Sequence, residues 1–164
     1  LYQLNDYFSI FYFNFMKDNP KVDDNYWANT IDMPARKAWS GFTFEQVCKD
    51  HIDKIKKVLG ISGVYCEQSQ WFTKGDDTHP GAQIDLLIDR RDRIINICEI
   101  KFSINQFTID KDIDQALRNK IGIFKSITKT NKAINLVMIT TFGITKNKYS
   151  SVVQNEVTLD DLFS

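Results

Sequence analysis

The sequence predicts a mixed α/β fold in which one sheet is flanked by helices. Apolar residues recur at helical spacing in two segments, 41–59 and 110–129. Short apolar, β-branched runs typical of strands make up four more segments: 62–72, 82–89, 93–101 and 133–143. The order is therefore helix, three strands, helix, strand. Because a strand and a helix cross over to a further strand, at least one pair of strands is expected to be parallel.

The composition is that of a soluble globular protein. The chain has 164 residues, of which 43% are hydrophobic and 26% charged. This length suffices for one domain with a sizeable core. The three cysteines form no CxxC pair and match no recurring zinc module, which favours free thiols in a reducing cytoplasm. No apolar run approaches the roughly 20 residues of a spanning helix, so a cytoplasmic protein without membrane contact is expected.

The first 32 residues are expected to form a helical extension of a main domain at 33–164. Aromatic residues recur at helical spacing over residues 5–18, either as core packing or as a docking surface. Pro20 interrupts the pattern, and a second short helix is expected at 26–31. The chain begins with Leu1 rather than Met. We therefore expect a piece of a longer protein.

Capping residues and helix faces define the remaining elements. Thr43 is expected to cap the helix at 41–59, and Gly60 to end it. Glu45 falls at the edge of this helix's apolar stripe, where it can either face a cleft or pair with Lys49 at i, i+4. Residues 90–92 are expected to form the turn of a strand hairpin. Thr158 is expected to cap a last helical turn.

Charge is distributed unevenly, although the formal net charge is zero. Residues 111–148 are rich in lysine and arginine, with Asp112 and Asp114 as the acids of that segment. Such a stretch can attract phosphate groups. More often, such a lysine-rich stretch is a solvated helix face.

Acidic residues interrupt two otherwise apolar strands. Asp85 lies in the strand at 82–89, whereas Glu99 and Lys101 end the strand at 93–101. If the hairpin pairs residues of like parity, both carboxylates project from one face, opposite each other or one diagonal step apart. A divalent cation would relieve their repulsion. Because the ligands are hard oxygens, Mg²⁺ or Mn²⁺ is expected.

Such a metal beside a lysine suits attack of water on a phosphodiester. The metal would lower the pKa of a bound water and offset charge on the phosphate. Lys101 would orient or deprotonate that water, or stabilise the transition state. The alternative is a solvated sheet face on which Lys101 forms a salt bridge with the acids. Three apolar residues share that face by alternation, which favours partial burial: Leu87, Ile95 and Ile97.

The stretches "QID" and "CEIK", in which Glu99 follows Asp85 by 14 positions, resemble the D…(E/D)xK signature of the PD-(D/E)XK nucleases. The resemblance implies a restriction-endonuclease-like core of helix, three strands, helix and strand. It also implies that Lys101 is catalytic and that three acids bind metal: Asp85, Glu99 and Glu45. Gln83 and Gln115 would support the site. Ile84 replaces the signature's proline, and Asn119 stands where some members have a tyrosine four residues after the glutamine.

A wider resemblance covers nearly the whole chain. "LYQLNDYFSIFYFNFM", "HPGAQIDLLIDRRDRIINICEIKFS", "FTIDKD" and "TLDDLF" are similar to the C-terminal region of a family of prokaryotic AAA-type ATPases. There, an ATPase motor and a winged helix precede a nuclease-like domain. The resemblance implies a DNA-hydrolysing domain with DNA and the upstream ATPase domain as partners. Since this sequence lacks a Gly-rich phosphate loop, the motor would precede Leu1. Neutral net charge and the aromatic N-terminal segment suit an alternative, a catalytically weak or inactive module that serves the ATPase.

Overall fold

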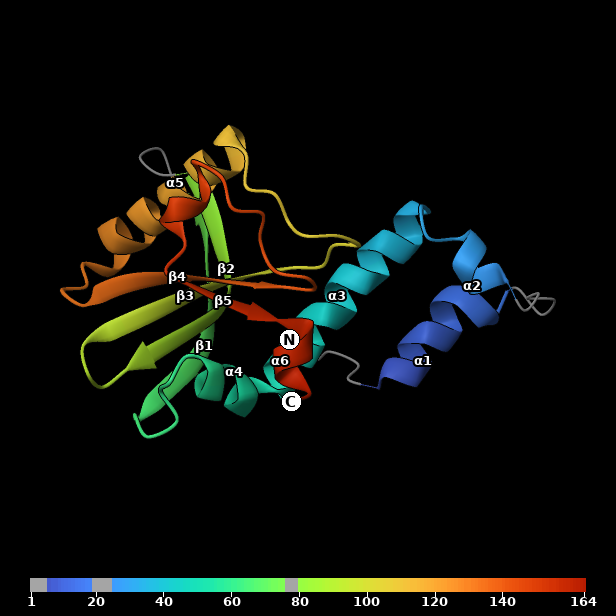
Figure 1. Ribbon diagram of the computed structural model, residues 1–164, viewed down its shortest axis with the longest axis horizontal. Helices are drawn as coiled ribbons and strands as arrows, with labels where there is room; N and C mark the ends of the chain where they lie inside the picture. Colours follow the sequence, from blue (N-terminus) through green and yellow to red (C-terminus); the bar gives the residue numbers. More distant parts are fainter. Residues whose placement is uncertain (1–5, 19–24, 76–79) are drawn as a thin grey trace. The chain divides into compact units, whose positions relative to one another are not determined.

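A computed structural model describes residues 6–18, 25–75 and 80–164. The chain divides into two compact units, Leu1–Thr43 and Phe44–Ser164. The division falls inside helix α3 (Pro34–Asp50), whereas the sequence placed a boundary after residue 32, close to the start of that helix. Figure 1 shows both units.

The N-terminal unit has an aromatic core of its own. Helix α1 (Tyr7–Phe11) continues into a π-helical turn (Tyr12–Met16), and α2 (Tyr26–Asn29) follows. Four rings pack with centroids 5.3 to 5.8 Å apart: Phe11, Phe15, Trp27 and Trp39. Part of the aromatic pattern is therefore core packing, while Phe8 is 67% exposed.

The C-terminal unit contains a five-stranded mixed sheet in the order β1-β2-β3-β4-β5 (Figure 1). Its strands are β1 (Cys66–Gly75), β2 (Pro80–Arg90), β3 (Ile94–Lys101), β4 (Ala133–Thr140) and β5 (Asn155–Thr158). The first three strands pair antiparallel, whereas β3–β4 and β4–β5 are parallel. The predicted α/β class with a parallel crossover is confirmed. Strand β5 was not predicted, because four residues carry too little alternation to be recognised.

Helices cover both faces of this sheet (Figure 1). Helix α5 (Lys111–Thr128) packs on one face, and α4 (Ile52–Val58), α6 (Leu159–Leu162) and the last turns of α3 pack on the other. On the α5 side the core includes Ile97, Leu117, Phe124, Leu136 and Met138. On the opposite side it includes Phe44, Cys48, Ile55, Leu86, Ile88, Cys98, Val137 and Leu162.

The helix predicted at 41–59 is two helices. The backbone departs from helical geometry at His51, with φ −104° and ψ 29°, and this residue separates α3 from α4. Thr43 lies inside α3, so its predicted capping role is wrong. One continuous apolar stripe concealed both features, because Cys48 and Ile55 face the same core. Gly60 has a φ of +68°, a left-handed conformation that ends α4 as predicted.

All three cysteines are free, and burial raises the pKa of the Cys48 thiol to about 12. That thiol is therefore protonated and unreactive at neutral pH. Within the ranges that the structure describes, no helix has both the length and the apolar character needed to cross a membrane.

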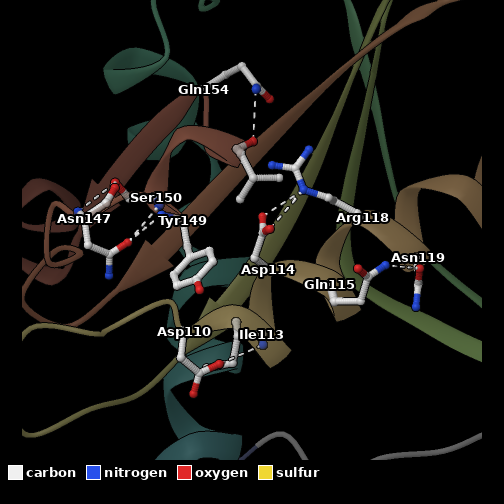
Figure 2. A network of polar contacts seen from close by, with 11 residues as sticks. Asp110, Ile113, Asp114, Gln115, Arg118, Asn119, Asn147, Tyr149, Ser150 and Gln154 are labelled. Carbon is white, nitrogen blue, oxygen red and sulfur yellow. Dashed lines mark hydrogen bonds and ion pairs between the residues drawn. The ribbon is translucent and has the colours of Figure 1, made fainter.

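Asp110 caps α5, the helix that carries part of the candidate site. Its carboxylate accepts a hydrogen bond of 2.9 Å from the backbone N–H of Ile113 (Figure 2). We expect Asp110→Ala to lower the free energy of unfolding by about 1 kcal/mol, because a helix N–H loses its partner. Urea unfolding measures this. Asp112→Ala, in the same turn, is the control, and an equal loss in that variant would contradict the capping role.

Candidate active site

The β2–β3 hairpin brings the two acids of the motif to neighbouring positions. Leu86 pairs with Cys98, and Leu87 pairs with Ile97, so residues of like parity face each other as predicted. Asp85 lies one residue before the first pair and Glu99 one residue after it. The two acids therefore occupy adjacent strands at the same end of the hairpin.

At Asp85, the side chains of strand β2 stop alternating strictly between the two faces of the sheet. Ile84 packs in the α5-side core together with Leu87, although strict alternation placed it with Leu86. A register shift between Ser69 and Trp71 of β1 lies opposite this point. Such a bulge inserts a residue and re-aims its neighbours. The prediction of strict alternation is wrong here, and Asp85 lines clefts on both sides of the sheet.

Asp85 is 7% exposed and is held by two long hydrogen bonds. The backbone N–H of Ile100 donates to Oδ2 at 3.3 Å, and Gln83 Nε2 donates to Oδ1 at 3.4 Å. Gln83 therefore contacts the residue it was predicted to support. Both bonds are longer than the usual upper limit of about 3.2 Å, so the carboxylate keeps acceptor capacity for a further ligand.

Glu99 is 5% exposed and binds two lysines. Its Oε1 lies 2.9 Å from Lys101 Nζ, and its Oε2 accepts a hydrogen bond from Lys120 Nζ. The two ammonium groups offset the free energy of burying this carboxylate. Lys120 comes from α5, and sequence reasoning did not identify it as a site residue. A signal existed, because Lys120 interrupts the apolar stripe of Ile113, Leu117 and Phe124.

Glu45 approaches the site from α3. It is half-buried, and its Oε2 lies 3.9 Å from Lys49 Nζ, as the structural alternative predicted. Burial raises the pKa of the Glu45 carboxyl, and the nearby Asp85 carboxylate raises it further. Within residues 6–18, 25–75 and 80–164, no three histidine, cysteine or acidic side chains gather into a ready-made metal group. A metal-binding role for Glu45 thus stays a prediction.

Gln115 does not line the cleft; its neighbour Asn119 does. Gln115 Nε2 donates to Asn119 Oδ1 at 2.8 Å, one turn along α5 (Figure 2). Asn119 lies on the cleft wall with Asp85 and Glu99. Gln115 can therefore act on the site only through Asn119, and its predicted supporting role stays a prediction.

Lys101 is a cation in this arrangement. Burial lowers its pKa, but the charge and hydrogen bond of Glu99 outweigh burial, and the pKa of Lys101 is raised overall. The side chain is therefore protonated at neutral pH. An ammonium group donates protons and attracts negative charge. Lys101 thus suits orientation of water or stabilisation of negative charge better than proton abstraction.

Asp85 and Glu99 line one cleft of about 510 Å³ between β2, β3 and helix α5, whereas Glu45 and Gln115 do not line it. Its charged residues are Asp85, Glu99, Lys101 and Lys120. Carboxylate oxygens are the ligands that Mg²⁺ and Mn²⁺ prefer, and Mg²⁺ is often bound through only one or two carboxylates together with waters. The cleft therefore combines potential ligands for a dication with cations that suit a phosphate.

The basic segment at 111–148 is partly neutralised by ion pairs. Arg118 pairs with Asp114 at 2.9 Å, and three lysines bind acids outside the segment: Lys120 binds Glu99, Lys132 binds Asp89, and Lys146 binds Glu156. Its attraction for phosphates is consequently weaker than the sequence suggested.

Glu45 gives a pH-dependent prediction. Because its pKa is raised in the folded state, ionisation of Glu45 removes stability as the pH rises through that pKa. We expect Glu45→Gln to gain stability relative to wild type between about pH 4 and pH 7, by at most about 1 kcal/mol, since the group is partly exposed. Urea unfolding at both pH values measures the change. Glu67→Gln, at an exposed position, is the control. If the difference in unfolding free energy between Glu45→Gln and wild type were the same at both pH values, the prediction would be refuted.

No protein-family model and no curated protein matches the sequence. A crystal structure of a protein of unknown function, AF1548, is similar over 71% of this chain with 12% sequence identity and a TM-score of 0.47. The chain covers 64% of that protein, less than two thirds of its length.

Proposed function

We propose that the Phe44–Ser164 unit hydrolyses phosphodiester bonds in DNA with Mg²⁺ or Mn²⁺, as the C-terminal domain of a larger ATPase. One observation carries the proposal: Asp85, Glu99 and Lys101 line a single cleft. Their order in the sequence also resembles the signature of the PD-(D/E)XK nucleases. The ATPase partner rests on the wider sequence resemblance.

The donor groups of the cleft fit a hard dication. Asp85 and Glu99 would hold the ion, and Glu45 would add a third carboxylate. The long hydrogen bonds of Asp85 leave room for such a ligand, since both exceed 3.2 Å. When bound, the ion would lower the pKa of a bound water and withdraw charge from the phosphate.

The protein's own residues would orient the Asp85 carboxylate and stabilise negative charge on the phosphate. Lys101, whose side chain lines the cleft, would offset negative charge on the phosphate in the transition state. Lys120 would supply a second cation from α5. Gln83 and the N–H of Ile100 would keep the Asp85 carboxylate oriented towards the cleft.

The experiment is DNA cleavage by the 164-residue protein. Single-stranded, duplex and branched DNA are incubated with Mg²⁺ or Mn²⁺, and with EDTA as the blank. Asp85→Asn should abolish cleavage, whereas Asp89→Asn should retain it, because Asp89 lies on the same strand but outside the cleft. Equal cleavage by Asp85→Asn and wild type, or no cleavage by wild type, would refute the nuclease.

A second candidate is a nuclease-like module without catalysis that docks to the ATPase. The specific observation in its favour is that lysines engage both oxygens of Glu99. This carboxylate is satisfied without a metal. The module predicts no metal-dependent cleavage by wild type, together with binding of the ATPase portion by this chain in a pull-down.

A further inference from the structure

An apolar pocket of about 290 Å³ adjoins the candidate active site. Four residues line both this pocket and the charged cleft, so the two spaces share a boundary: Glu99, Lys101, Ala116 and Lys120. The remaining wall is apolar: Phe107, Ile113, Leu117 and Met138. Neither a metal ion nor a phosphate requires such a surface.

We infer that this pocket takes the base of an unpaired nucleotide whose phosphate lies in the cleft. The inference rests on the proposed function and specifies its substrate as DNA with an unpaired nucleotide at the cleavage site. The volume is roughly ten times the ~30 Å³ that one water occupies in the liquid, which accommodates the ring atoms of a purine.

The chemistry of the pocket matches a base joined to a phosphate. Phe107 offers a ring on which a base can stack, and aliphatic side chains suit its flat faces. At the boundary, one carboxylate meets two ammonium groups, so the three side chains carry a net positive charge. An apolar peptide side chain would bring no anion to that charge. A base within a duplex must first be unpaired and unstacked, whereas an unpaired base enters without that cost.

Ala116→Leu narrows the pocket at its boundary with the cleft, so the comparison of a base-containing with an abasic oligonucleotide, rather than total binding, tests the pocket. Ala116 is exposed on α5, and leucine is a good helix former, so the fold should be kept. Ala133→Leu, at the exposed first residue of β4 and outside the pocket, is the matched control. The probes are a short single-stranded oligonucleotide with one 2-aminopurine and the same oligonucleotide with an abasic site there. Binding is measured in EDTA by fluorescence and by competition, independently of cleavage.

We expect the base-containing oligonucleotide to bind wild type and Ala133→Leu about tenfold more tightly than the abasic one. This preference should be lost in Ala116→Leu. Equal binding of both oligonucleotides by wild type would overturn the inference. The proposed function would survive that result if wild type still cleaved DNA. Conversely, a base preference that depends on Ala116, found without any cleavage, would support the pocket and refute the nuclease.

Discussion

Glu99→Gln is expected to lower the rate of metal-dependent DNA cleavage by at least about a hundredfold. Glutamine keeps the shape of the side chain but removes its negative charge. The dication would lose one of its two main carboxylate ligands, and Lys101 and Lys120 would lose the acid that positions them. Initial rates at saturating Mg²⁺ measure the effect, with circular dichroism to verify folding.

Glu156→Gln is the matched control for this experiment. Glu156 is also an ion-paired glutamate in a strand of the sheet, bound to Lys146, but it does not line the cleft. Its replacement should leave the rate within about threefold of wild type. If Glu99→Gln behaved in the same way, Glu99 would be structural and the nuclease assignment would be wrong.

Ile97→Ala is expected to lower the free energy of unfolding by about 2–5 kcal/mol. Ile97 is fully buried in β3, between β2 and β4 and beneath α5. Truncation removes apolar contacts and leaves a cavity that a central strand cannot close. Urea unfolding monitored by tryptophan fluorescence and circular dichroism measures the loss.

Ile104→Ala separates burial from residue type. Ile104 is 57% exposed in the loop after β3, so its truncation should change stability by less than about 0.5 kcal/mol. Similar losses in both variants would mean that β3 is not at the centre of the core.

Local patterns in the sequence predicted much of this fold. The periodicity of 110–129 located α5 to within one residue at each end, and apolar runs located β2, β3 and β4. Features that depend on tertiary contacts were missed. Strand β5 exists through pairing with β4, and the break at His51 leaves the apolar stripe intact. The face of the sheet on which Ile84 lies is set by a bulge in the pairing of β2 with β1. The sequence of one strand alone does not reveal such a bulge.

The candidate site likewise has residues that the sequence predicted and one that depends on tertiary packing. Asp85, Glu99 and Lys101 lie on two consecutive strands, so a hairpin that pairs residues of like parity predicted one cleft, although the bulge makes Asp85 line a cleft on the other side of the sheet as well. Lys120 lies 21 residues beyond Glu99, on helix α5. It contacts Glu99 only because α5 packs on the sheet. Gln115 was chosen by position in a resemblance, but the helix presents Asn119 to the cleft instead.

Anomalous diffraction from a crystal soaked in Mn²⁺ tests whether the two strand carboxylates share one dication. The proposal predicts a single strong peak in the cleft, at about 2.1 Å from an oxygen of Asp85 and an oxygen of Glu99, with at least one lysine displaced from Glu99. Diffraction at saturating Mn²⁺ that showed no peak there, with Lys101 and Lys120 still bound to Glu99, would contradict it.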